Sequence, residues 1–174
     1  MNIEDVKKEI RDIVDFPIPG IIFKDLTTAF KSAECMKFFE EEMYNLYKDS
    51  GITKVVGIES RGFIMAPILG NKLGVGFVPV RKKGKLPAET IEVSYSKEYG
   101  TDTIQMHKDA LSSDDVVLLH DDLLATGGTM KAACDLVRKF GVKKIYVNFL
   151  VELDALEGRK LFDEDIQVDS LLHY

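Results

Sequence analysis

The 174-residue sequence has no tryptophan, only two cysteines, and no apolar run close to the roughly 18 residues that a membrane-spanning helix needs. Cys35 and Cys134 cannot form the dense disulfide framework of a small secreted protein, so we expect a reduced, intracellular setting. The first residues, Met1 to Asp5, are acidic where a secretory signal would carry basic side chains. These absences predict a soluble, cytoplasmic protein that does not enter membranes.

An excess of positive charge is also missing, because the formal net charge is −6. Domains that recognise nucleic acid through bulk electrostatics are usually basic, so we expect no nucleic-acid partner, although a local basic site stays open. Hydrophobic residues make up 45% and charged residues 30%, as in an ordinary globular protein. Without repeats or an obvious linker, the chain is predicted to form a single domain over residues 1–174.

Apolar periodicity predicts an alternation of helices and strands. A helix is expected from Ile3 to Val14, before the prolines of Phe16–Gly20, and a second one follows Ser32, a candidate N-cap. Further strands are predicted at residues 54–58, 75–80, 90–95, 101–106, 116–119 and 144–151, and further helices at 62–73 and 130–140. Such alternation predicts a mostly parallel central sheet with helices on both faces. Ligands bind beyond the carboxyl ends of such strands, here after Ile58, Val80 and Leu119.

The segment Val116–Thr129 carries the strongest functional signal. A buried strand is followed by two acids, then by a loop of small residues and the start of a helix. The loop can direct its backbone N–H groups and two hydroxyls at a phosphate, with the positive end of the helix dipole behind it. The predicted phosphate cradle consists of Ala125, Thr126, Gly127, Gly128 and Thr129. It lacks the Gly-Lys-Ser/Thr of a Walker loop.

Asp121 and Asp122 lie between this strand and the cradle. Two adjacent carboxylates repel each other unless they have partners, and ribose hydroxyls can donate a hydrogen bond to each. Acids and cradle together therefore fit a ribose 5-phosphate. The alternative, that the acids are turn or capping residues and the glycines an ordinary loop, does not account for the order of strand, acids, cradle and helix.

The string Asp-Asp-Leu-Leu-Ala-Thr-Gly-Gly-Thr resembles the 5-phosphoribosyl 1-diphosphate (PRPP) motif of type I phosphoribosyltransferases, and among them most closely that of adenine phosphoribosyltransferases. The resemblance implies the type I α/β fold, a mostly parallel central sheet flanked by helices with a small N-terminal hood. The hood would span about residues 1–30 and the core about 31–174, with a mobile loop near 81–106. His120 departs from the apolar residue usual there; it either packs at the strand end or alters the pKa of the acids.

Two further segments suit a diphosphate. Arg61, in Gly57–Phe63, offers a fixed fork of N–H donors, and the string resembles the diphosphate loop of the same family. The resemblance implies that Glu59 and Ser60 also bind diphosphate, that a non-proline cis peptide joins them, and that Arg61 is catalytic. The basic cluster after the third strand can be a solvated turn or a site that neutralises a leaving group. The resemblance assigns the second role to Arg81, Lys82 and Lys85.

The segment Ser94–Gly100 resembles the loop that closes over the site in these enzymes, and closure would exclude water. The resemblance makes Glu98 the catalytic residue that transfers the purine proton and Tyr99 a lid residue. The segment Phe16–Asp25 resembles the hood that binds adenine. Phe23 would stack on the base, while backbone groups near Ile22 and Lys24 would read its edge. Lys24 stands where many relatives carry arginine.

The resemblance therefore implies transfer of the phosphoribosyl group from PRPP to N9 of adenine, giving AMP and diphosphate. It further implies Mg²⁺ held mainly by the substrate with no direct protein ligand, and a homodimer. Two alternatives stay open. One is transfer to another purine, namely xanthine, hypoxanthine or guanine; the other is a non-catalytic PRPP sensor. A sensor that regulates transcription would need a DNA-binding segment, and the roughly 15 residues before Phe16 are too few for one.

Overall fold

The computed structural model describes residues 1–16, 19–20, 22–97 and 100–174. Within these ranges the centre is a seven-stranded sheet in the order β5-β6-β4-β3-β7-β8-β9. Strands β4, β3, β7, β8 and β9 run parallel, and the β5–β6 hairpin joins antiparallel to β4. The strands span β3 Lys54–Ile58, β4 Gly76–Lys82, β5 Thr90–Lys97, β6 Gly100–His107, β7 Val116–Leu124, β8 Lys144–Glu152 and β9 Gln167–His173. The predicted mostly parallel sheet is confirmed.

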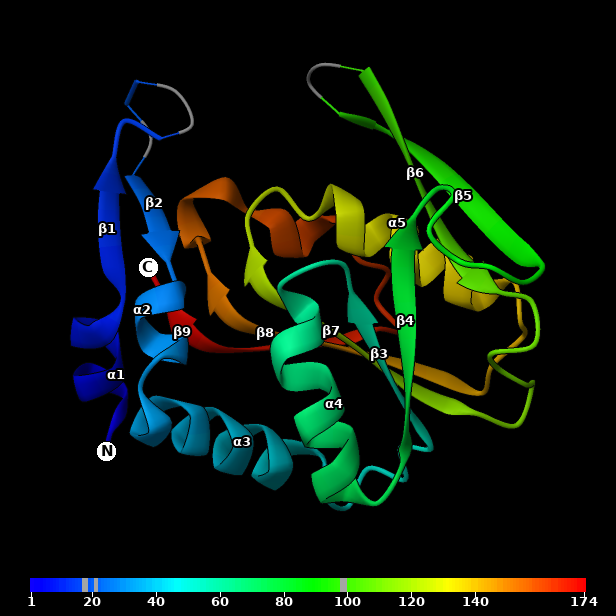
Figure 1. Ribbon diagram of the computed structural model, residues 1–174, viewed down its shortest axis with the longest axis horizontal. Helices are drawn as coiled ribbons and strands as arrows, with labels where there is room; N and C mark the ends of the chain where they lie inside the picture. The colour runs from blue at the N-terminus through cyan, green and yellow to red at the C-terminus, as the bar shows by residue number, and fades with distance from the viewer. Residues whose placement is uncertain (17–18, 21, 98–99) are drawn as a thin grey trace.

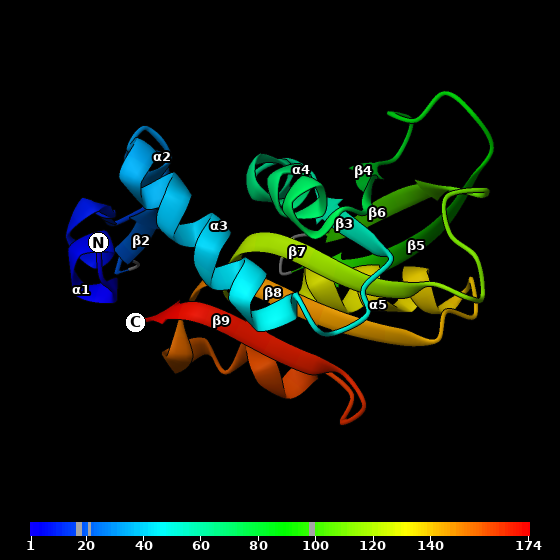
Figure 2. The same ribbon diagram turned by 90° about the horizontal axis from the view of Figure 1, so that it is seen from below.

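Helices cover both faces of this sheet (Figure 2). On one face lie α3 (Ala33–Tyr47) and α4 (Gly62–Leu73), which bury apolar side chains such as Phe39 and Met65 against the strands. On the other face lies α5 (Gly128–Arg138), packed through Met130, Val137 and their neighbours. Ser32 caps α3 as predicted, since its hydroxyl accepts a hydrogen bond from the Cys35 amide at 3.3 Å.

The N-terminal segment differs from the expected helix over residues 3–14. Helix α1 (Ile3–Glu9) ends at Ile10, and β1 (Arg11–Val14) pairs antiparallel with β2 (Ile22–Asp25). The spacing of Ile10, Ile13 and Val14 suits a helix locally, but residues 11–14 pair with β2 instead, and the β-branched Ile13 and Val14 also suit a strand. A short helix α2 (Thr27–Phe30) then leads into α3. The β1–β2 sheet stands at one end of the molecule and the β5–β6 hairpin at the other (Figure 1).

Strand β7 is longer than the predicted 116–119, and it includes both acids. Its pairing with β3 ends at His120, whereas its pairing with β8 continues to Leu124. The expectation that the acids follow the strand was therefore wrong: they lie within it, beyond the end of β3. The chain after β8 forms two 3-10 turns, η1 (Asp154–Leu156) and η2 (Gly158–Leu161), before β9. Across the described part of the chain, helices are too short or too polar to cross a membrane.

Candidate active site

Three segments meet beyond the carboxyl ends of the parallel strands. The loop after β3, the loop after β4 and the exposed end of β7 enclose a cavity of about 550 Å³. It is lined by Glu59, Ser60, Arg61, Lys82, Lys85, Asp121 and Asp122. Sequence analysis selected all seven residues, which come from three segments spread over residues 59–122. Parallel strands bring them together because their carboxyl ends share one edge of the sheet.

Arg61 forms an ion pair with the acid pair. Its Nε atom lies 2.5 Å from Oδ2 of Asp122, whose side chain is almost fully buried, while the arginine side chain is 42% exposed. Asp121 accepts a hydrogen bond on Oδ1 from the Asp122 amide at 2.9 Å. The backbone of α4 approaches closely here, because a Cβ on Gly62 would lie 2.7 Å from the His120 carbonyl oxygen. Arg61 and both acids therefore line the same cavity, joined by this ion pair.

Burial raises the pKa of Asp121 well above its ordinary value, and the neighbouring charge of Asp122 raises it further. Burial also raises the pKa of Asp122, although the charge of Arg61 opposes this rise. Such perturbed carboxyl groups in a cavity mark candidate functional sites. Hydroxyl donors from a ligand would stabilise both ionised forms.

Glu59 and Arg81 form a second ion pair on the same rim. Arg81 donates from Nε to Oε2 of Glu59 at 3.2 Å and from a terminal nitrogen to Oε1 at 3.3 Å. The Lys82 amide donates to Oε2 at 3.0 Å. Burial works to raise the pKa of Glu59, but these hydrogen bonds outweigh it and lower the pKa. Glu59 thus remains an anion that orients Arg81, and the peptide bond from Glu59 to Ser60 is cis, as the resemblance implied.

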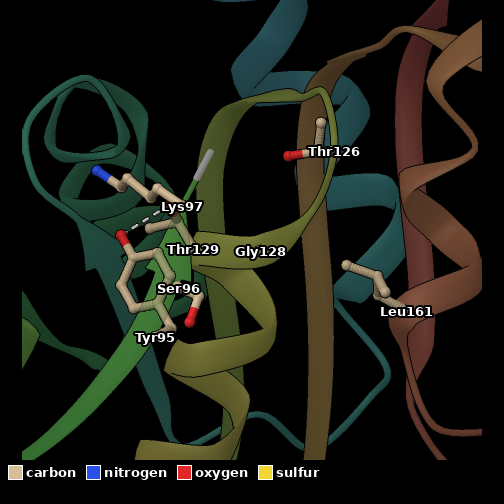
Figure 3. A pocket seen from close by; sticks show the side chains of 7 residues that line it. All are labelled: Tyr95, Ser96, Lys97, Thr126, Gly128, Thr129 and Leu161. Carbon is tan, nitrogen blue, oxygen red and sulfur yellow. Dashed lines mark hydrogen bonds between the residues drawn. The ribbon is translucent and has the colours of Figure 1, made fainter. Parts of the chain in front are cut away.

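The cradle loop connects β7 to α5. Gly127 has a φ of +85° and precedes the first residue of the helix, so the backbone of the loop turns sharply there. Thr126, Gly128 and Thr129 line a cavity of about 620 Å³ together with Tyr95, Ser96, Lys97 and Leu161 (Figure 3). Ala125 and Gly127 line a smaller cavity of about 120 Å³ that also contacts Asp121. The predicted cradle residues therefore surround one end of the site.

Sequence analysis missed two supports of the cradle. Turn η2 packs directly on it, because a Cβ on Gly127 would lie 2.8 Å from the Gly158 carbonyl oxygen. Tyr95 of β5 reaches it from the opposite side, with its hydroxyl 3.0 Å from Oγ1 of Thr129. The glycine at position 158 was a signal for the contact with η2, because a Cβ there would clash with the cradle backbone. The alternation of Ile91, Val93 and Tyr95 on the core face of β5 was a signal for the second.

The hood reaches the acid pair through one aromatic ring. The guanidinium carbon of Arg61 lies 5.4 Å from the centre of the Phe23 ring, and Phe16 meets that ring edge-on at 5.3 Å. Ile22 is 52% exposed and begins β2. The side chain of Lys24 is already engaged, since Nζ lies 2.7 Å from Oδ1 of Asp12 and 4.2 Å from the centre of the Tyr174 ring. The Lys24 side chain thus joins β2 to β1 and to Tyr174.

Two predicted residues, Glu98 and Tyr99, lie outside the described residues. His120, the departure from the motif, is fully buried and contacts Asn148, with Nδ1 2.9 Å from the amide oxygen. Burial lowers the pKa of His120 to about 4. Its side chain thus packs, neutral, in the sheet at the base of the acid pair.

Comparisons with known proteins agree with this geometry. Residues 29–170 match the family model described as "Phosphoribosyl transferase domain". An adenine phosphoribosyltransferase of Bacteroides thetaiotaomicron is 63% identical over 172 residues, covering 99% of this chain and 98% of the relative. A crystal structure of adenine phosphoribosyltransferase from Rhodothermus marinus superposes with a TM-score of 0.92 at 48% identity, covering 99% and 98% of the two chains. The Giardia lamblia enzyme complexed with 9-deazaadenine also superposes with a TM-score of 0.92, at 44% identity, covering 100% of this chain and 98% of that one.

Proposed function

The chain belongs to the phosphoribosyltransferase family and, within it, to the adenine phosphoribosyltransferases, and from this membership we propose how its residues work. The enzyme transfers the 5-phosphoribosyl group of PRPP to N9 of adenine, giving AMP and diphosphate, a reaction of purine salvage. One observation supports this activity best. Asp121 and Asp122 share a cavity with the cations Arg61, Lys82 and Lys85, and they lie on β7, the strand that leads into the cradle.

The acid pair binds the ribose hydroxyls, and the cradle from Ala125 to Thr129 binds the 5-phosphate. Each hydroxyl donates a hydrogen bond to a carboxylate, which stabilises the charged forms that burial disfavours. Backbone N–H groups at the start of α5 and the hydroxyls of Thr126 and Thr129 donate to the phosphate. This binding energy arises far from the bond that breaks, and it orients C1 of the sugar.

The leaving diphosphate departs with the electron pair of the C1–O bond while the N9–C1 bond forms. Cationic groups that stabilise the developing negative charge lower the barrier. Arg61, Lys82 and Lys85 line the cavity that would hold the diphosphate. Arg81 contributes from the rim, oriented by Glu59. Ser60, exposed beside Arg61, adds a hydroxyl donor.

The base binds between the hood and the acid pair. Phe23 offers a ring face beside the guanidinium of Arg61, and an aromatic adenine can stack in line with them. Backbone groups at Ile22 and Lys24 read the edge of the base. By family resemblance Glu98 accepts the N9 proton and Tyr99 belongs to the lid, which excludes water during transfer.

The donor set of the site fits Mg²⁺ held by the substrate. In the described residues, two of the three cavity carboxylates pair with protein cations, Glu59 with Arg81 and Asp122 with Arg61, while Asp121 accepts from the Asp122 amide. Magnesium retains several waters and commonly uses one or two carboxylates together with substrate phosphates. Asp121 and Asp122 would act on the ion through the ribose hydroxyls, with no direct protein ligand. The bound ion supplies positive charge to the leaving diphosphate.

We extend the proposal to the whole chain. It forms a single domain over residues 1–174, with a hood at about 1–30, a core at about 31–174, and a mobile loop near 81–106. It works in the cytoplasm as a homodimer, without nucleic-acid or membrane partners.

AMP formation from adenine, PRPP and Mg²⁺ tests the activity, with hypoxanthine, guanine and xanthine in parallel reactions. We expect turnover with adenine alone. Turnover with another base only would retain the chemistry and contradict the role of the hood. Binding of PRPP without turnover on any base would contradict an enzymatic function and favour a sensor.

A further inference from the structure

The hydroxyl of Tyr95 contacts the cradle, although the proposed reaction gives Tyr95 no role. Tyr95 lies near the end of β5, on the face that packs against the core beneath it. Its ring extends along the first turn of α5, and its hydroxyl meets Oγ1 of Thr129 at 3.0 Å (Figure 3). Ser94, the preceding residue, faces the opposite side, where its hydroxyl lies 2.8 Å from that of Thr103 on β6.

The direction of the Tyr95–Thr129 hydrogen bond follows from the ligand. A phosphate oxygen only accepts hydrogen bonds, and a threonine hydroxyl has a single hydrogen to donate. If Thr129 donates to the 5-phosphate, its oxygen must accept from Tyr95. A chain of donors then runs from the Tyr95 phenol through the Thr129 hydroxyl to the phosphate, and each bond in such a chain polarises the next.

Tyr95 also lines two neighbouring cavities of the site. It lines the 620 Å³ cavity at the cradle, and it lines a 220 Å³ cavity that contacts Glu59, Arg81, Lys82 and Asp121. The Lys97 ammonium lies 5.6 Å from the centre of its ring and pairs with Asp102 on β6 at 2.5 Å. Tyr95 therefore borders both cavities, as do Lys97 and Thr129, and it lies on the hairpin that carries the loop expected to close.

We propose that Tyr95 is a positioning residue for PRPP: its hydroxyl orients the Thr129 hydroxyl toward the 5-phosphate and ties the β5–β6 hairpin to the cradle. This inference rests on the proposed function, in which Thr129 binds the 5-phosphate. In this proposal a residue of β5, outside the β7–α5 motif, takes part in binding the 5-phosphate.

The test compares Tyr95→Phe, Thr129→Val and the double variant in the full-length enzyme. Tyr95→Phe keeps the ring and removes only the hydroxyl. We expect it to raise KM for PRPP and the inhibition constant of ribose 5-phosphate by about fivefold to tenfold, as for loss of one hydrogen bond. KM for adenine and inhibition by diphosphate should change by less than about twofold. The double variant should bind ribose 5-phosphate no worse than Thr129→Val, because Tyr95 acts through Thr129.

Tyr47→Phe is the matched control, since it removes the same phenol hydroxyl from a tyrosine that lines none of the cavities described above and donates to Asp169 at 2.8 Å. It should leave KM for PRPP within about twofold. Unchanged PRPP binding in Tyr95→Phe, with weakened binding in Thr129→Val, would overturn the role of Tyr95 alone. Multiplying effects in the double variant would also overturn it. Unchanged binding in Thr129→Val would overturn the assignment of the cradle itself, and the inference with it.

Discussion

His120 and Asp122 lie two residues apart on β7, and burial acts on both in the direction of the neutral form. It lowers the pKa of the histidine to about 4 and raises that of the carboxyl. Only Asp122 has a cation beside it, Arg61, which supports its charged form. The histidine instead contacts the uncharged amide of Asn148. At the scale of residues, a difference in partner thus separates a candidate ligand-binding group from a packed one.

The buried histidine predicts a dependence of stability on pH. Its pKa in the folded protein, about 4, lies below the ordinary value of 6.5, so its contribution is fully present above pH 6.5 and is lost as the pH falls toward 4. His120→Leu should remove on the order of 3 kcal/mol of this pH-dependent change in unfolding free energy. Denaturant unfolding at pH 7, 6, 5 and 4 measures it.

Leu118→Val is the control, on the same face of the same strand and without a titratable group. It should lower the unfolding free energy by a similar amount at every pH. A slope in His120→Leu equal to that of the wild type would show that the histidine does not titrate as its burial indicates.

At the scale of elements, the cradle depends on contacts from three directions. Strand β7 and helix α5 define the loop, η2 supports it through Gly158, and β5 reaches it through Tyr95. Turn η2 is in turn connected to β8, because Arg159 pairs with the buried carboxylate of Glu152. The cradle loop is therefore held in place by segments on both sides of the β7–α5 motif, as a preorganised binding site would require.

Gly127→Ala should disturb the cradle. A Cβ at this position would lie 2.8 Å from the Gly158 carbonyl oxygen, on a residue with φ of +85°. Left-handed backbone costs an alanine about 1–2 kcal/mol, so we expect a melting temperature about 3–8 °C lower. KM for PRPP should also rise. Differential scanning calorimetry and steady-state kinetics measure the two effects.

Gly128→Ala is the stability control, because a Cβ there has no neighbour within 4 Å among the described residues and the residue begins a helix. Its melting temperature should stay within about 2 °C of the wild type. Equal melting temperatures for Gly127→Ala and the wild type would contradict a strained cradle loop.

At the scale of the whole molecule, the last residue of the chain joins the hood to the core. Backbone hydrogen bonds fix Tyr174 beside β8, and its ring lies 4.2 Å from Nζ of Lys24 and 5.2 Å from Nζ of Lys7. Lys24 in turn pairs with Asp12 on β1. Because Lys24 follows Phe23 on β2, we expect the contact with Tyr174 to help orient Phe23 toward Arg61.

Tyr174→Leu should loosen the hood and leave the PRPP site intact. Loss of the cation–π contacts predicts a rise in KM for adenine of about threefold to tenfold, with KM for PRPP unchanged. Tyr44→Leu, which removes a similar contact with Lys72 far from the hood, serves as control and should leave KM for adenine unchanged. An equal rise in both Michaelis constants of Tyr174→Leu would contradict a role confined to the hood.

Local patterns in the sequence predicted much of this protein. Alternating apolar runs predicted the parallel sheet and α3 to α5, since helix and strand periodicities are set by neighbouring residues. The small-residue loop after the acids and the helix that follows it were predicted and are present; the binding of phosphate and ribose there stays a prediction. Sequence analysis could also predict that Arg61, Lys82 and Lys85 meet, because the carboxyl ends of parallel strands lie at the same edge of the sheet.

Other features were decided only by the tertiary structure. The β1–β2 pairing replaced an expected helix, because residues 11–14 pair with residues 22–25 and not with their own helical neighbours. The extension of β7 through the acids depends on pairing with β8, and the partners of Arg81, Tyr95 and Lys24 come from other segments of the chain. These contacts join residues from different segments of the chain, so no pattern among neighbouring residues predicts them. They form only when the chain folds.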